Sequence, residues 1–126
     1  EEEITGDPAN ELSMIYINSR GGLEDRIYRI ESRDSLATVP MDRTAHVMGP
    51  VSIPPEDEGA ASAATVAEFR ASVSWITHIY GIHGTATLGG YSDYTLRRVA
   101  DAWRIAKKRV VLIDDRLEVP VDIYHL

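Results

Sequence analysis

Apolar and polar residues alternate one by one through the middle of the chain, from Ala67 to Trp75. This is the pattern of a strand with one buried face, and the stretch is rich in aromatic and β-branched residues. The same region also fits a helix, because a second set of apolar residues recurs at helical spacing: Val66, Phe69, Val73, Ile76 and Tyr80. Gly81 stands where a helix often ends. We predict a strand over 65–80 and keep the helix as the alternative.

A second apolar pattern follows Ser92 and Asp93. Its members recur at intervals of three and four residues: Leu96, Val99, Ala100, Trp103 and Ala106. Ser92 or Asp93 offers a side-chain oxygen that can cap a helix, and the basic residues at the end of the segment suit the C-terminal end of a helix dipole. The pattern therefore predicts one well-defined helix near 94–109.

Short apolar runs on either side of turn-forming residues predict two hairpins. Asn18 to Gly22 has the composition of a tight turn, so we predict a hairpin over 12–31. Asp114 to Arg116 separates two further apolar runs and predicts a C-terminal hairpin over 110–124. Pro120 cannot donate a backbone hydrogen bond, which puts the last strand at a sheet edge.

These patterns together predict an α+β fold, formed by a single small domain with a mostly antiparallel β-sheet. A chain of 126 residues suits one domain, and its apolar content of 44% is typical of chains that fold. The acidic start Glu1-Glu2-Glu3 and the Gly6-Asp7-Pro8 break predict a flexible acidic arm over 1–11. The single α+β domain is then expected over 12–126.

Charge and composition exclude several classes of partner and cofactor. The net charge is −7, which disfavours nucleic acid and anionic lipid, and no apolar run approaches the roughly 20 residues of a membrane helix. The absence of cysteine excludes disulfides and thiolate metal sites. His78 and His83 are five residues apart, which is not a zinc-binding spacing. We expect no metal, no cofactor, no nucleic acid and no membrane, in a protein that is soluble or part of a larger particle.

One string of residues resembles part of a known enzyme family. Tyr16-Ile17-Asn18-Ser19 followed by Gly21-Gly22 is similar to the strand and turn that shape the oxyanion region of Clp-type serine peptidases. Ala60 to Ala63 is similar to that family's nucleophile loop, and Ile82-His83 before Leu88 to Tyr91 to its histidine region. The resemblance implies a degenerate Clp-like serine hydrolase, whose triad would be Ser62, His83 and Asp114 or Asp115.

Our first functional prediction is nevertheless a non-catalytic structural or assembly subunit. Six of the thirteen basic side chains lie between Arg97 and Arg109, close to several aromatic residues, and aromatic and arginine side chains dominate protein interfaces. The expected interface residues are Tyr91, Tyr94, Arg97, Trp103, Arg104, Lys107 and Lys108. We expect protein partners, including copies of the chain itself, as in a viral or phage particle such as a phage tail. The other alternative is a small-molecule binding domain with an aromatic pocket near Trp75 and Trp103.

Overall fold

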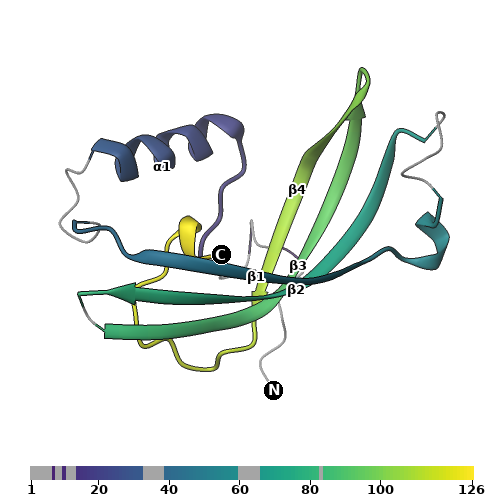
Figure 1. Cartoon of the computed structure of the whole chain (residues 1–126). Coiled ribbons are helices and arrows are strands. Elements are labelled where there is room, and N and C mark those ends of the chain that lie inside the picture. Colours follow the sequence, from purple (N-terminus) through teal and green to yellow (C-terminus); the bar gives the residue numbers. More distant parts are fainter. Residues whose placement is uncertain (1–6, 8–9, 11–13, 33–38, 60–65, 83) are drawn as a thin grey trace. The chain divides into compact units, whose positions relative to one another are not determined.

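The computed structural model describes residues 7, 10, 14–32, 39–59, 66–82 and 84–126 (Figure 1). The chain divides into two compact units, residues 1–42 and residues 43–126, each of which is described by itself. The first unit holds the helix α1 (Arg20–Ser32). The second holds a four-stranded antiparallel sheet. Most of residues 1–11 lie outside the described ranges, so the arm over 1–11 and the single domain over 12–126 stay predictions.

The hairpin predicted over 12–31 is wrong, because Arg20–Ser32 forms α1. Ser19 caps the helix: its Oγ accepts a hydrogen bond from the backbone N–H of Gly22 at 3.1 Å. Within the first turn and a half of the helix, Arg20 Nε and Glu24 Oε1 form an ion pair at 2.7 Å, which stabilises the helix on its surface. The two glycines that indicated a turn thus lie in the first helical turn.

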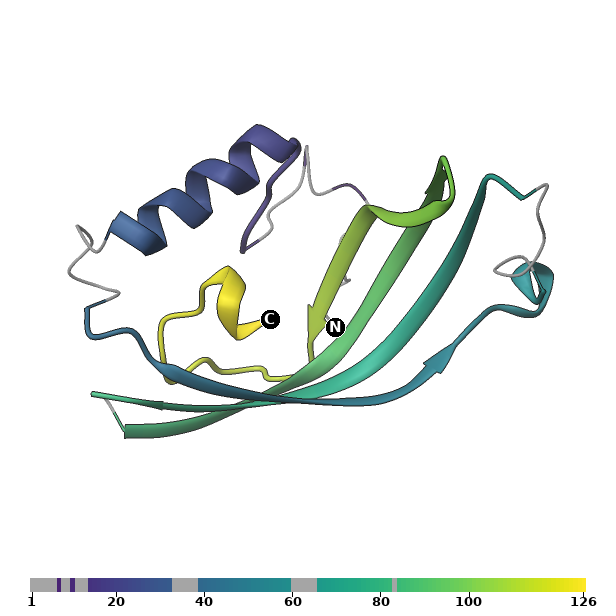
Figure 2. The same cartoon turned by 45° about the horizontal axis from the view of Figure 1, so that its top comes forward.

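The strands of the second unit follow one another in the sheet in chain order, each antiparallel to the next. They are β1 (Arg43–Ser52), β2 (Glu68–Gly81), β3 (Gly84–Val99) and β4 (Ala102–Leu112). The sheet is long and strongly curved (Figure 2). The predicted α+β class with a mostly antiparallel sheet is confirmed.

The alternating pattern around Trp75 was interpreted correctly, since residues 68–81 form β2. Every second side chain of this strand is buried: Phe69, Ala71, Val73, Trp75, Thr77 and Ile79. The side chains between them are exposed or half-buried. One face of the sheet therefore carries the core of this unit.

The helix predicted near 94–109 is wrong, because this segment forms the end of β3, a two-residue turn and most of β4. The turn is Ala100-Asp101, and Ala100 adopts a positive φ of 53°. Leu96 and Trp103 share a face in the strands as they would in a helix, since both pack against the cluster around Phe69. The segment is a strand because β3 pairs with both β2 and β4, although its apolar residues recur at helical spacing.

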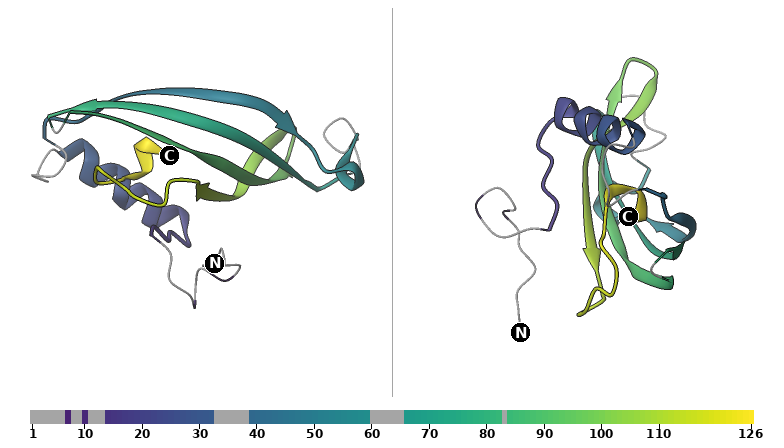
Figure 3. Two further views of the ribbon diagram at one scale, coloured as in Figure 1. Left: turned by 90° about the horizontal axis from the view of Figure 1, so that it is seen from below. Right: turned by 90° about the vertical axis from the view of Figure 1, so that its left-hand side faces the viewer.

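The predicted C-terminal hairpin is also wrong. β4 ends at Leu112, and residues 113–126 add a short 3-10 helix, η3 (Ile123–His125), in place of a second strand. Two of the alternating apolar residues of this segment, Val119 and Val121, contact the core instead of pairing. Together with Leu126 they pack against the cluster of Trp75, Ile79 and Leu88. The segment lies on the concave side of the sheet, where it is drawn in yellow (Figures 2 and 3).

Candidate subunit interface

The two faces of the sheet differ in what covers them. We call the face that carries Phe69, Trp75 and Ile79 the packed face, because the core clusters lie on it. The opposite face, which carries Ile76 and Tyr80, we call the open face. Side chains directly opposite each other on paired strands lie on the same face, so the strand register gives the remaining members of the open face.

An apolar row crosses the middle of the open face. Val47 of β1 pairs with Ile76 of β2, and Ile76 pairs with Gly89 of β3. The backbone N–H of Ile113 donates to Gly89 O at 3.0 Å, and a Cβ added at Gly89 would lie 3.4 Å from Ile113 Cδ1. The Ile113 side chain therefore occupies the space above the glycine. We call Val47, Ile76 and Ile113 the apolar row; they are 67%, 54% and 71% exposed.

A charged zone lies on one side of this row, toward the turn between β3 and β4. In register across β2, β3 and β4, its charged members are Glu68, Arg70, Asp93, Arg97, Arg104, Lys107 and Arg109. Arg97 Nε and Glu68 Oε2 form an ion pair at 3.0 Å. A longer pair joins Arg109 Nη1 to Asp93 Oδ2 at 3.8 Å. The strands contribute five basic and two acidic side chains to this zone.

Arg70 is held by the turn that precedes β2. Its Nε lies 2.9 Å from Asp57 Oδ2, and its Nη2 lies 2.7 Å from Glu56 Oε1. Both acids belong to the 3-10 helix η2 (Pro55–Asp57). Asp57 Oδ2 also accepts the backbone N–H of Arg70 at 2.9 Å. Side-chain hydrogen bonding from Arg70, followed by this backbone bond, holds the pKa of Asp57 below its ordinary value.

We expect the substitution Arg70→Gln to raise the pKa of Asp57 toward its ordinary value, because it removes the charged donor. A depressed folded-state pKa stabilises the fold above the ordinary carboxyl pKa, and this contribution is lost as the pH falls through the folded-state value. The measurement is a carboxyl titration by NMR. Arg97→Gln is the control, since Arg97 pairs with Glu68 instead. An unchanged Asp57 titration in Arg70→Gln would contradict the assignment.

The other side of the apolar row is polar. In register there, Ala45 lies beside His78 and Thr87, and Arg43 lies beside Tyr80 and Thr85. The Arg43 guanidinium carbon lies 6.0 Å from the centre of the Tyr80 ring, within the range of a cation–π contact. These two rows of the open face contain no carboxylate.

The structure distributes the predicted interface residues over both faces. Tyr91, Arg97, Arg104 and Lys107 are in register on the open face. Three others lie on the packed face: Tyr94, Trp103 and Lys108. The Trp103 ring meets Phe69 edge to face at 4.8 Å, and Lys108 Nζ donates to Leu126 O at 3.2 Å. The interface itself stays a prediction. Its residues are close together in the sequence, but in the structure they form two groups, one on each face of the sheet.

Sequence reasoning missed the three members of the apolar row. A signal for Ile76 was present, because it is an apolar residue in the polar phase of the alternating strand. Val47 and Ile113 carry no comparable local signal. They come from segments far apart in the chain and meet Ile76 only through the strand register and the hydrogen bond at Gly89.

The residues of the Clp-like alternative are not brought together in the described part of the chain. Ser62 and His83 lie outside the described residues. Asp114 has another role: its Oδ2 accepts the backbone N–H of Gly89 at 2.9 Å and so helps to fix the end of β4 on β3. Part of the string that resembled the peptidases, Arg20 to Gly22, starts α1.

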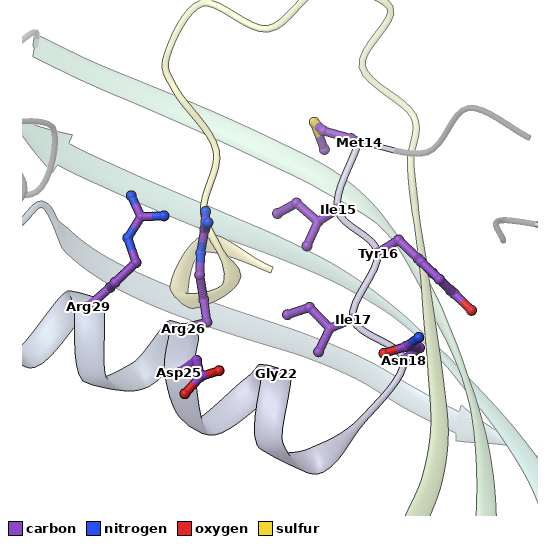
Figure 4. A pocket seen from close by; sticks show the side chains of 9 residues that line it. All are labelled: Met14, Ile15, Tyr16, Ile17, Asn18, Gly22, Asp25, Arg26 and Arg29. Carbon is purple, nitrogen blue, oxygen red and sulfur yellow. The ribbon is translucent and has the colours of Figure 1, made fainter.

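A groove of about 430 Å³ lies in the first unit (Figure 4). It runs between the segment Met14–Asn18 and α1, where Gly22, Asp25, Arg26 and Arg29 line it. Ile15 and Ile17 point to the side of the helix, whereas Tyr16 points the opposite way (Figure 4). Trp75 and Trp103, expected to line an aromatic pocket, belong instead to two separate core clusters of the second unit.

Neither a metal-ligand cluster nor a membrane-spanning helix is present in the described ranges. No three histidine, aspartate or glutamate side chains among those residues are grouped as metal ligands. In the same part of the chain, no helix combines the length and apolar character needed to cross a bilayer.

Comparison with known proteins identifies the family. A family model described as the ring hydroxylating beta subunit matches residues 1–119. The anthranilate 1,2-dioxygenase small subunit of Acinetobacter baylyi is 33% identical over 121 residues, which cover 95% of this chain and 69% of that protein. The toluate 1,2-dioxygenase subunit beta of Pseudomonas putida is 30% identical over 125 residues, covering 99% and 72%. The crystal structure of the benzoate 1,2-dioxygenase beta subunit from Burkholderia mallei matches with a TM-score of 0.69 and 34% identity, covering 93% and 71%.

These matches overturn the predicted function. The viral or phage particle component is wrong, because the relatives are subunits of aromatic-ring dioxygenases. The alternatives of a Clp-like hydrolase and a small-molecule binding domain are wrong for the same reason. The expectation of protein subunits as partners is confirmed, since a beta subunit is one component of a multi-subunit enzyme. The chain belongs to the family of ring-hydroxylating dioxygenase beta subunits.

Proposed function

We propose that this chain is the small subunit of a 1,2-dioxygenase that acts on a benzoate-class aromatic acid. The observation that carries the proposal is the agreement among four relatives, each covering at least 95% of this chain. They are named for anthranilate, toluate, benzoate and 2-halobenzoate 1,2-dioxygenases. All four compounds are benzene rings that carry a carboxylate and differ only in a small substituent.

In this enzyme we expect the chain to contact the other protein subunits through its sheet. It presents to its partners a sheet whose packed face carries the core clusters and whose open face carries exposed apolar and charged side chains. Partners that bind only the folded chain stabilise it, so assembly and folding of this subunit are linked. The proposal includes contacts between copies of this chain as well as contacts with a large subunit.

The test compares cells that produce both subunits of the source organism with cells that produce the large subunit alone, so that cellular metabolism supplies the reductant. We expect cells with both subunits to consume oxygen together with benzoate, anthranilate or a 2-halobenzoate, at least about tenfold faster than cells with the large subunit alone. The rate follows from assembly, because a large subunit that lacks its partner loses the stabilisation that binding supplies. Oxygen uptake and loss of the acid are followed together.

Toluene serves as the control substrate, because it has the ring without the carboxylate. The proposal fails if toluene is consumed and none of the benzoate-class acids is. It also fails if the large subunit alone consumes the acids as fast as the pair.

A further inference from the structure

We propose that the open face of the sheet is the docking surface for the large subunit. The apolar row of Val47, Ile76 and Ile113 would lie at its centre, and carboxylates of the large subunit would face the charged zone. The inference rests on the proposed function and extends it, because it assigns a surface and a chemical character to the contact.

The first argument is the exposure of the apolar row. Three aliphatic side chains that are each more than half exposed lie on one line across neighbouring strands. Val47 and Ile76 lie on adjacent strands, about 4.8 Å apart, and the Ile113 side chain occupies the space above Gly89 on the next strand. Apolar side chains gathered at the centre of a polar surround are the usual composition of a protein interface, because water is expelled from the centre and kept at the rim.

The second argument is charge. The whole chain carries a net charge of −7, yet the charged zone holds five basic and two acidic side chains. Three of the five basic side chains are already paired: Arg70 with Asp57 and Glu56, Arg97 with Glu68, and Arg109 with Asp93. The ion pairs among the described residues leave out Arg104 and Lys107. A partner that brings carboxylates to these two side chains would supply the complementary charge, and complementary charges also fix the orientation of docking.

The third argument concerns a second copy of the chain. A two-fold axis that pairs the apolar row with itself leaves two choices for the charged zone. It lies opposite the charged zone of the other copy, or opposite the polar rows of Arg43, His78 and Tyr80, which contain no carboxylate. In the first choice five of the seven charged side chains that each copy brings are basic, and in the second choice the facing rows contain no carboxylate. The open face therefore suits an isologous contact poorly. The large subunit is the partner that fits.

The experiment measures binding of the purified large subunit of the source organism to wild-type chain and to two variants, Ile76→Glu and Ile113→Glu. Each variant puts a charge into the apolar row, and we expect the dissociation constant to rise at least about 30-fold, as for an interface hot spot. Ile105→Glu is the matched control: Ile105 is 61% exposed on the same sheet, but it pairs with Leu96 on the packed face. We expect the control to bind within about threefold of wild type, since its face is not part of the proposed contact.

Folding of each variant is checked by circular dichroism and thermal unfolding. Ile113 lies beyond the end of β4, so Ile113→Glu keeps the test valid if Ile76→Glu disturbs the strand. The charge reversal Arg104→Glu with Lys107→Glu tests the second argument. We expect it to weaken binding about tenfold at low salt and to remove most of the salt dependence seen with wild type.

The outcomes separate the two proposals. If wild-type chain does not bind the large subunit, the proposed function fails and the docking surface fails with it. If wild type binds and the row variants bind equally well, only the docking surface is overturned. Light scattering of the small subunit alone tests whether a second copy of the chain binds the open face. If the chain forms an oligomer that Ile76→Glu dissociates, and this variant still binds the large subunit as wild type does, then the face binds a second copy and the proposal is overturned.

Discussion

Replacing Gly90 by alanine is expected to destabilise the sheet by about 3 kcal/mol or more, at the upper end of the cost of overpacking. An added Cβ would overlap the carbonyl oxygen of Val111, and it would lie 3.1 Å from the carbonyl carbon and 3.2 Å from Trp75 Cζ2. The oxygen belongs to the backbone of β4, so it cannot move away by a change of rotamer. Either β4 shifts away from β3 or the Trp75 ring is displaced. The free energy of unfolding is measured by urea denaturation.

Gly89→Ala is the matched control for this experiment. The two glycines are adjacent in β3, but the Cβ at Gly89 would lie 3.4 Å from the flexible end of the Ile113 side chain, which is close to an ordinary contact. We expect this variant to unfold within about 1 kcal/mol of wild type, because the added methyl group would meet a flexible side-chain end that can move slightly. Equal losses in Gly89→Ala and Gly90→Ala would show that the close approach of β3 and β4 at Gly90 is not the cause.

Trp75→Ala is expected to lower the free energy of unfolding by about 3–5 kcal/mol, the usual range for removing a buried large aromatic side chain. Trp75 is 4% exposed, and it lies in the cluster that joins β2 and β3 to the C-terminal segment. Its loss leaves a cavity between the sheet and the segment that carries Val119 and Val121, so both sides lose their contacts together. Urea denaturation gives the change directly.

The neighbouring variant Ile76→Ala shows how much of the loss in unfolding free energy comes from burial and how much from strand propensity. Ile76 is 54% exposed on the open face, one residue away in the same strand. We expect it to lose about 1 kcal/mol, mainly through strand propensity and partial burial. If Trp75→Ala costs no more than Ile76→Ala, then the packed face does not hold the core of this unit.

The strand β2 could be predicted from the sequence because its signal is local. Phe69 to Trp75 alternate with polar residues, and this period alone fixes which side chains are buried when one face of a strand is covered. The prediction required no knowledge of the partner strands, which explains why the structure confirms it.

The segment 94–109 could not be predicted in this way. Leu96 and Trp103 are seven residues apart, a spacing that fits two turns of a helix and equally two strands joined by a short turn. The turn at Ala100-Asp101 lacks the glycine or asparagine that marks most two-residue hairpins, although Ala100 takes the positive φ that they supply. Only pairing of β3 with β2 and with β4 distinguishes the two structures, and that pairing joins residues far apart in the chain.

Some residues of the open face could be named from the sequence, but the reason that they lie together could not. The predicted interface includes Arg97 and Arg104, which the sequence placed in a helix; in the structure they share a face because they are directly paired across β3 and β4. Lys107 joins them, whereas Lys108 points to the packed face since neighbouring residues of a strand alternate. Strand pairing therefore keeps part of the predicted interface group on the open face and places the rest on the packed face.

The run of basic residues on β4 has a further consequence for the sheet as a whole. β4 and β1 are its two outer strands, and an outer strand presents unpaired backbone groups to which another chain can add. Repeated lysine and arginine along β4, and Pro50 with the register shift between Met48 and Val51 in β1, are devices that prevent such addition. The sheet can thus offer an apolar face to a specific partner while its edges resist the growth of aggregates.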